Sequence, residues 1–153
     1  MHRPVVCVFW TGNPGEWLSV VLGSSACRVF AVQINFADEG AKITGVLSRS
    51  YEYIIEASNT TTDISTMYSN SSVSSKHSSI VSGRGANAAG GAAVTWKTIV
   101  ERGSGASDAP HDWVELPAAI TARTLRITSH FTPGNGKFSL SGFRVFGTIG
   151  FCL

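Results

Sequence analysis

The stretch that decides the fold is Arg123-Thr-Leu-Arg-Ile-Thr-Ser-His-Phe-Thr-Pro-Gly-Asn-Gly-Lys-Phe-Ser-Leu-Ser-Gly-Phe-Arg-Val-Phe-Gly147. Its first part alternates apolar with polar side chains and places Leu125 and Ile127 on one face, which is the period of a half-buried strand. Proline and glycine residues then break the pattern before a second strand begins. The stretch therefore predicts two strands around a polar loop. This loop contains His130, Phe131 and Asn135.

The second strand of this stretch changes its alternation part of the way along. Phe138 and Leu140 share one parity, whereas Phe143 and Val145 share the other. Both pairs can face the same core only if the strand contains one extra residue. Ser141-Gly142 lies between the pairs, and we expect a β-bulge there.

Composition restricts the class of protein. The chain has 153 residues, of which 43% are hydrophobic and 14% charged, and this predicts one globular domain over residues 1–153. The net charge of +2 favours neither a nucleic-acid partner nor an anionic membrane. No apolar run approaches the roughly 20 residues of a membrane span, and residues 1–10 lack the pattern of a signal peptide. We therefore expect neither a membrane span nor a signal peptide.

The chain has three cysteines, Cys7, Cys27 and Cys152. We expect them to be buried or spare thiols, with one disulfide as the alternative.

Short strands recur along the rest of the chain. The clearest one covers residues 29–36, where Phe30, Val32, Ile34 and Phe36 alternate with small or polar residues. Similar patterns predict strands at residues 16–22, 51–57, 96–100 and 113–116. No segment shows a clear helical period. The fold class is therefore all-β, an antiparallel β-sandwich or barrel.

Residues 59–94 differ from their surroundings. They are rich in Ser, Thr, Asn, Gly and Ala and show no strong period, which predicts a long, mostly disordered insertion within a hairpin. Loop-closure entropy grows slowly with length, so a sandwich tolerates such an insertion. Asn59 and Asn70 begin glycosylation sequons, which in so Ser- and Asn-rich a stretch can also arise by chance.

The directions of the strands sort the loops by end. If each connection reverses the chain, residues 10–15, 38–42, 107–112 and 129–137 share one end of the sandwich, and the insertion lies at the other. We call these four loops the rim. Polar and aromatic side chains on loops held by rigid strands are suited to bind a ligand. The candidates are Trp10, Asn13, Asp38, Asp108, His111, Asp112, His130, Phe131 and Asn135.

Several runs of the chain, in this order, resemble the discoidin family, also called coagulation factor five/eight type C domains. They are Gly15-Glu-Trp-Leu-Ser-Val-Val-Leu-Gly23, Ala31-Val-Gln-Ile-Asn-Phe-Ala-Asp38, the Tyr-x-Tyr-x-x-Glu-x-Ser run at 51–58, Trp96-Lys-Thr-Ile-Val100 and Arg123-Thr-Leu-Arg-Ile-Thr128. Asp108-Ala-Pro-His-Asp112 and the run at 136–147 are similar to a subgroup: the C-terminal modules of bacterial xylosidase- and arabinofuranosidase-type glycoside hydrolases.

The resemblance implies a galactose-binding-like jelly roll, an extracellular location and binding of a plant-type or galactose-containing glycan by loops at one end. The chain would be a non-catalytic module from, or attached to, a polysaccharide-degrading enzyme. A cell-surface protein-interaction or adhesion domain is the alternative, because a fold does not fix a function.

The chain departs from the family at three places. Val21 stands where the family usually has Asp, the family's N-terminal strands and Asp/Asn-rich loop have no counterpart before Trp10, and Ser141-Gly142 replaces an acidic residue. A hard cation needs several clustered oxygens, so we expect neither calcium nor another cofactor. Acidic residues share the rim, but no motif of a nucleophilic, metallopeptidase or phosphate-binding site is present, and we do not expect catalysis.

Within this reading, aromatic and charged residues divide by position. Trp10 and Phe131, in loops, are expected to stack on a sugar, whereas Trp17, Trp96 and Trp113 each open a strand and are expected in the core. His111 either hydrogen-bonds a sugar hydroxyl or braces its loop together with Asp112. Arg126 is expected on a solvated or ion-paired strand face.

Overall fold

The computed structural model describes residues 10–23, 25–37, 51–59, 80–84, 94–103, 111–131 and 136–149. Within these ranges the chain forms strands and no helix. The strands are β1 Trp10–Gly12, β2 Glu16–Val21, β3 Cys27–Phe36, β4 Glu52–Ser58, β5 Ile80–Arg84, β6 Lys97–Arg102, β7 His111–Ala122, β8 Thr124–Phe131 and β9 Phe138–Ile149. That residues 1–153 are one domain stays a prediction.

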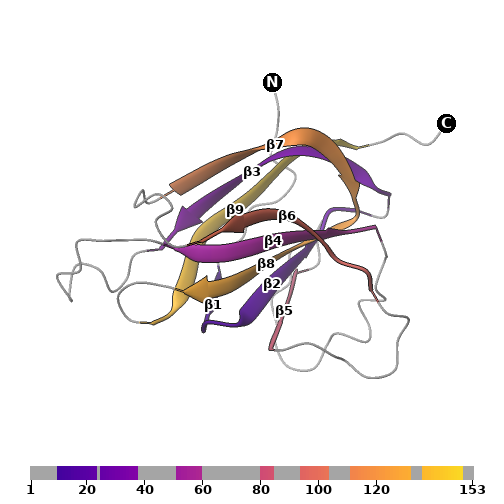
Figure 1. Cartoon of the computed structure of the whole chain (residues 1–153). Coiled ribbons are helices and arrows are strands. Elements are labelled where there is room, and N and C mark those ends of the chain that lie inside the picture. Colours follow the sequence, from indigo (N-terminus) through magenta and orange to yellow (C-terminus); the bar gives the residue numbers. More distant parts are fainter. Residues whose placement is uncertain are drawn as a thin grey trace.

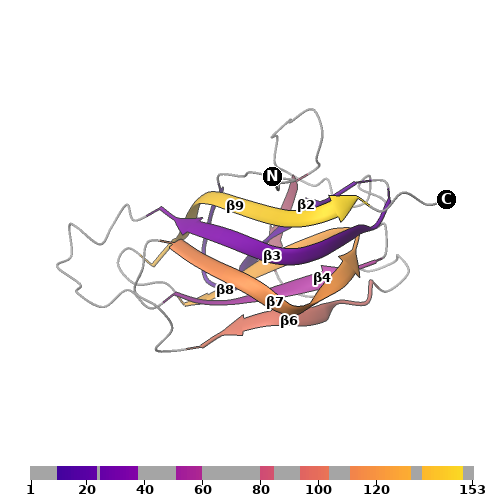
Figure 2. The same cartoon turned by 90° about the horizontal axis from the view of Figure 1, so that it is seen from above.

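The strands form two antiparallel sheets packed face to face (Figures 1 and 2). The four-stranded sheet has the order β1-β9-β3-β7, and the five-stranded sheet has the order β5-β2-β8-β4-β6. Alternating apolar residues of both sheets fill the space between them, as expected for a sandwich. The predicted antiparallel β-sandwich is confirmed.

An aromatic cluster fills the core at one end. The rings of Phe36 and Tyr51 stack with centroids 3.8 Å apart and planes 2° from parallel. Phe138 meets both edge-on, at 5.9 Å from Phe36 and 6.3 Å from Tyr51. Because Phe36 ends β3 and Phe138 begins β9, this cluster lies directly beneath the rim.

The predicted bulge in β9 is confirmed. Asn35 of β3 lies opposite Gly142, but Phe36 lies opposite Leu140, so Ser141 is the extra residue. Phe138, Leu140, Phe143 and Val145 are all fully buried. One inserted residue therefore lets both halves of β9 face the same core.

A second bulge, which the sequence pattern did not predict, bends β3 and β7. Val29 pairs with Ile120 and Ala31 with Glu115, so residues 116–119 of β7 have no partner on β3. Pro117 lies in this bulge, where its missing N–H costs no ladder hydrogen bond. Phe30 lies at the register shift between Val29 and Ala31 and is only half-buried. The loop expected after residue 116 is instead the bulge and the continuation of β7 to Ala122.

The segment at 59–94 does lie within a hairpin, because β4 and β6 are antiparallel neighbours. It also contributes β5, which pairs with β2 at the opposite edge of the five-stranded sheet. Composition alone gave no sign of this strand. Residues 60–79 and 85–93, including Asn70, lie outside the described residues.

A hydrogen-bonded ion pair links the two sheets beneath the rim. Oδ2 of Asp112 on β7 accepts hydrogen bonds from the hydroxyl of Tyr53 at 2.5 Å and from Nε of Arg102 at 3.1 Å. Tyr53 and Arg102 belong to β4 and β6 of the five-stranded sheet, whereas β7 is an edge of the other sheet. Burial, together with the Asp112 carboxylate, raises the pKa of Tyr53 above its usual value.

Gly147 marks a close approach of β9 to β3 and provides a test of this packing. A Cβ at this position would lie 2.6 Å from the carbonyl oxygen of Arg28 and 3.3 Å from Cα of Val29. Gly147→Ala must push two central strands apart, and we expect it to lower the free energy of unfolding by about 1–3 kcal/mol. Urea denaturation measures this change.

Gly103 is the matched control, because a Cβ there would meet nothing within 4 Å. Gly103→Ala should change the free energy of unfolding by less than about 1 kcal/mol. Equal effects of the two substitutions would contradict the close approach of β9 to β3.

The Tyr53 network predicts a stability that depends on alkaline pH. Because the pKa of Tyr53 is raised in the folded state, the unfolded chain loses this proton first once the pH exceeds about 10. The free energy of unfolding should then fall by up to about 1.4 kcal/mol per pH unit for this group. Tyr53→Phe should remove that part of the slope, whereas Tyr51→Phe should keep it. Urea denaturation between about pH 9 and 11 tests this; identical slopes for the wild type and Tyr53→Phe would refute it.

Candidate functional site

The strand registers bring the predicted rim loops to one end. Gly12 lies opposite Phe138, Asn35 opposite His111, and Glu52 opposite Phe131. The ends of β1, β3 and β8 therefore lie beside the starts of β9, β7 and β4, on the left in Figure 1. For the parts of the rim that the structure describes, the sorting of loops by strand direction is confirmed.

The turn between β1 and β2 is braced from within. The Asn13 backbone N–H donates to Oε2 of Glu16 at 2.8 Å, and Nδ2 of Asn13 donates to Oε1 of Glu16 at 3.2 Å. The N–H of Gly15, whose φ of 84° suits glycine, donates to the carbonyl of Ser129 at 2.7 Å. This bond fastens the turn to the end of β8, where His130 is exposed. Asn13 thus both braces the turn and lies exposed beside β8.

Trp10 does not lie in a loop, as was expected, but in strand β1. Its ring is partly buried against the core, with its centroid 6.2 Å from that of Phe138. The ring also crosses Gly12, where an added Cβ would clash with it. The expected loop position of Trp10 is therefore wrong, because the residue lies in β1 and covers one edge of the core. Its expected contact with a sugar stays a prediction.

His111 and Asp112 have different surroundings although they are neighbours. The carboxylate of Asp112 is held by Tyr53 and Arg102 and is partly buried. Asp112 therefore acts as a brace between the sheets, with partners other than His111. His111 is exposed at the start of β7, opposite Asn35. Of the two, His111 is the residue that a ligand can reach.

The remaining candidates are not placed in full. Asp38, Asp108 and Asn135 lie outside the described residues, and for Phe131 the structure gives only the backbone, in β8.

Within the described residues, no group of three or more His, Cys, Asp or Glu side chains is arranged to hold a metal ion. Among the residues that the structure describes, no helix is long and apolar enough to cross a membrane. Cys27 is a buried free thiol, and burial raises its pKa.

Trp113 was expected in the core but is 46% exposed, the one large exposed hydrophobic side chain among the described residues. Its ring contacts Phe146 with centroids 4.9 Å apart, and its indole N–H donates to Oε1 of Glu115 at 3.2 Å. Gln33 pairs with Trp113 on one side and with Arg144 on the other. We call the outer face formed by His111, Gln33, Trp113, Arg144 and Phe146 the Trp113 surface.

A signal for this exposure was present in the sequence. Val114 and Leu116 share one parity and turn toward the core, whereas Trp113 shares the other parity with Glu115. Because successive side chains of a strand point to opposite faces, Trp113 must lie on the outer face of β7. The same alternation places His111 on that face, so the Trp113 surface begins at the rim.

The other two strand-opening tryptophans are half-buried on the five-stranded sheet rather than in the core. The Arg126 guanidinium lies 4.3 Å from the centroid of the Trp96 ring and 5.8 Å from that of Trp17. Nη2 of Arg126 also lies 2.6 Å from Oε2 of Glu56. The expected ion pairing of Arg126 is confirmed, and this cation–π stack is a structural use of both rings.

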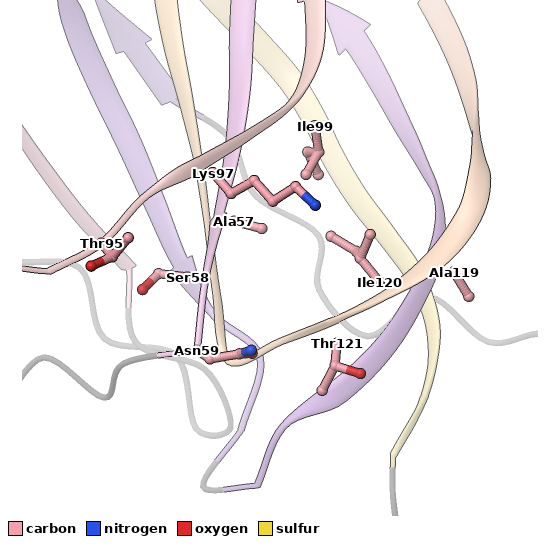
Figure 3. A pocket seen from close by; sticks show the side chains of 9 residues that line it. All are labelled: Ala57, Ser58, Asn59, Thr95, Lys97, Ile99, Ala119, Ile120 and Thr121. Carbon is pink, nitrogen blue, oxygen red and sulfur yellow. The ribbon is translucent and has the colours of Figure 1, made fainter.

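A pocket of about 530 Å³ opens at the end of the sandwich opposite the rim (Figure 3). It lies between the end of β4, the start of β6 and the last part of β7. Its lining residues are Ala57, Ser58, Asn59, Thr95, Lys97, Ile99, Ala119, Ile120 and Thr121. None of them was among the ligand-binding candidates from the sequence, because the pocket is formed by residues that are far apart in the chain.

Neither a family model nor a curated protein matches the sequence. The structure, however, is similar to solved carbohydrate-binding modules. Chitosan-binding module 1 of a chitosanase/glucanase from Paenibacillus sp. IK-5 is 20% identical, with a TM-score of 0.55 over 92% of this chain and 76% of that one. CpGH89CBM32-6, produced by Clostridium perfringens, is 15% identical, with a TM-score of 0.53 over 91% and 75%.

A third similar structure is the CBM32 of AlyQ in complex with 4,5-unsaturated mannuronic acid. It is 17% identical, with a TM-score of 0.54 over 95% of this chain and 98% of that one. Identities this low show a common fold and no more. The chain therefore has the galactose-binding-like β-sandwich fold that these carbohydrate-binding modules share.

Proposed function

We propose that this chain is a non-catalytic carbohydrate-binding module whose ligand surface runs from the rim to Trp113. The observation that carries the proposal is the fold, shared over 91–95% of the chain with three modules named for carbohydrate binding or solved with a sugar acid. The exposed position of Trp113 on that fold supplies the contact surface.

The chemistry of the Trp113 surface suits a sugar ring. A pyranose presents C–H groups on its faces and hydroxyls around its edge, so it needs a flat apolar platform flanked by hydrogen-bonding groups. Trp113 provides the platform, while Gln33, Arg144 and His111 provide donors and acceptors beside it. Phe146 and Glu115 already hold the indole ring, so little side-chain entropy is lost on binding.

The rim completes the proposed site. Asn13 and His130 are exposed at the same end of the sandwich as His111. We assign the remaining polar contacts to Asp38, Asp108 and Asn135, and a second stacking contact to Phe131, on the basis of the strand directions that bring their loops together.

The resemblance in the sequence extends this proposal to the parent protein and the ligand. We place the module in, or attached to, an extracellular polysaccharide-degrading glycoside hydrolase of the xylosidase or arabinofuranosidase type. Its ligand would then be a plant-type or galactose-containing glycan. The runs at 108–112 and 136–147 support this assignment.

Replacing Trp113 tests the proposed surface. Trp113→Ala should weaken binding to the preferred polysaccharide at least about tenfold, because it removes the platform, and Trp113→Phe should retain most of it. Stability should change by less than about 1 kcal/mol, since the ring is largely outside the core. Affinity electrophoresis in gels containing xylan, arabinogalactan, chitosan or alginate identifies the glycan and compares the variants.

Glu101→Ala, at an exposed position on β6, is the control and should bind like the wild type. A folded wild type that binds none of these glycans overturns the function. Binding that survives both Trp113→Ala and His111→Ala overturns the assigned surface but leaves the function standing.

A further inference from the structure

The pocket opposite the rim arises from the way the two sheet edges diverge. β6 and β7 are edge strands of different sheets and share no ladder. Near the rim, Arg102 of β6 and Asp112 of β7 form an ion pair that joins them. Farther along, the bulge at residues 116–119 bends β7 (Figure 2), and the edges are separated by the pocket.

The lining divides into an apolar floor and a polar margin. Ala57 is buried, and Ile99 and Ile120 are half-buried and pack against the core. Asn59, Thr95 and Thr121 are exposed around this floor. Figure 3 shows the Lys97 side chain extended across the pocket toward Ile120, with its nitrogen beyond Ala57. A ligand would thus meet apolar groups below, hydroxyl and amide groups at the side and an ammonium group.

The charge around the pocket is positive. None of its nine lining residues is acidic. The ion pairs described elsewhere are Arg102–Asp112 and Arg126–Glu56, and no acidic side chain pairs with Lys97 within the described part of the chain. Arg28, also exposed, lies opposite Thr121 in the sheet. An anionic group entering the pocket therefore meets an attractive potential.

We propose that this pocket is a second binding site, which takes an acidic sugar residue with its carboxylate on Lys97. A uronic acid carries three groups that this lining can bind: a carboxylate, several hydroxyls and an apolar C–H face. The volume of about 530 Å³ is within the usual range of small-ligand pockets, about 300–1,000 Å³. The proposal rests on the proposed function only in taking a saccharide as the ligand. The pocket shares no residue with the rim or the Trp113 surface.

The test titrates the protein with methyl β-glucuronide and with methyl β-glucoside, which differ only at C6, where the first has a carboxylate and the second a hydroxymethyl group. Methyl spectra of ¹³C-labelled isoleucine report the location. The glucuronide should shift the signals of Ile99 and Ile120 and leave that of Ile34, which is fully buried in the core, unchanged. The glucoside should bind at least about tenfold more weakly, because it lacks the ion pair.

Charge variants at Lys97 test the assigned contact. Lys97→Gln should weaken glucuronide binding about tenfold and Lys97→Arg should largely preserve it, because Arg retains the charge. Glu101→Gln changes a residue on the same strand but outside the pocket. In this variant, the glucuronide should shift the Ile99 and Ile120 signals as it does in the wild type. Higher ionic strength should weaken binding, since the pair is exposed to solvent.

The proposal is overturned by no shift of Ile99 and Ile120, by equal binding of glucuronide and glucoside, or by glucuronide binding that Lys97→Gln does not weaken. Inorganic phosphate that shifts both signals as strongly as the glucuronide also overturns it, by showing a general anion site. In the Trp113→Ala variant, the glucuronide should still shift the signals of Ile99 and Ile120. This variant therefore separates a failure of the pocket from a failure of the proposed function.

Discussion

Strand β9 can contribute to the core along its whole length only because Ser141 is inserted into it. Side chains of a strand alternate between faces, so Phe138 and Phe143, five positions apart, would otherwise point in opposite directions. The bulge turns both into the core. Phe138 can then join Phe36 and Tyr51 in the aromatic cluster under the rim. The position of the rim loops therefore depends on one unpaired residue, whose hydroxyl donates to the carbonyl of Asn35 at 3.3 Å.

The difference between the two ends of the sandwich has its origin in the edge strands. A sandwich leaves an edge on each sheet, and unpaired edges must be covered or bridged. At the rim, the Tyr53–Asp112–Arg102 network bridges β6 and β7 with partly buried, charge-assisted hydrogen bonds. At the other end, Pro117 and its neighbours leave the ladder, and an open pocket takes the place of a bridge. The same pair of strands thus forms a closed junction at one end and a cavity at the other.

Period-two alternation was enough to predict most of the strands, the bulge at Ser141 and the sorting of loops by end, because burial of one face imposes that period. The alternation did not predict features that depend on backbone pairing at a sheet edge or on contacts between distant segments. β5 lies at a sheet edge and pairs through its backbone, so Ile80–Arg84 carries no alternation to detect. Trp113 was assigned to the core by residue type, although its parity with Glu115 placed it outside. The Tyr53–Asp112 bond and the pocket join segments distant in sequence, and no local pattern encodes them.

The two proposed ligand surfaces rely on forces of different range. Stacking on Trp113 acts at van der Waals contact and salt screens it little, whereas an exposed lysine attracts a carboxylate through a field that is screened within about 8 Å at physiological ionic strength. Orientation at the first surface comes from the ring, which Phe146 and Glu115 hold in place. At the pocket, Lys97 supplies charge on a flexible stem, and orientation must come from Asn59, Thr95 and Thr121 around the apolar floor. Under these two proposals, neutral glycans bind the Trp113 surface, and only a glycan with a carboxylate also binds the pocket.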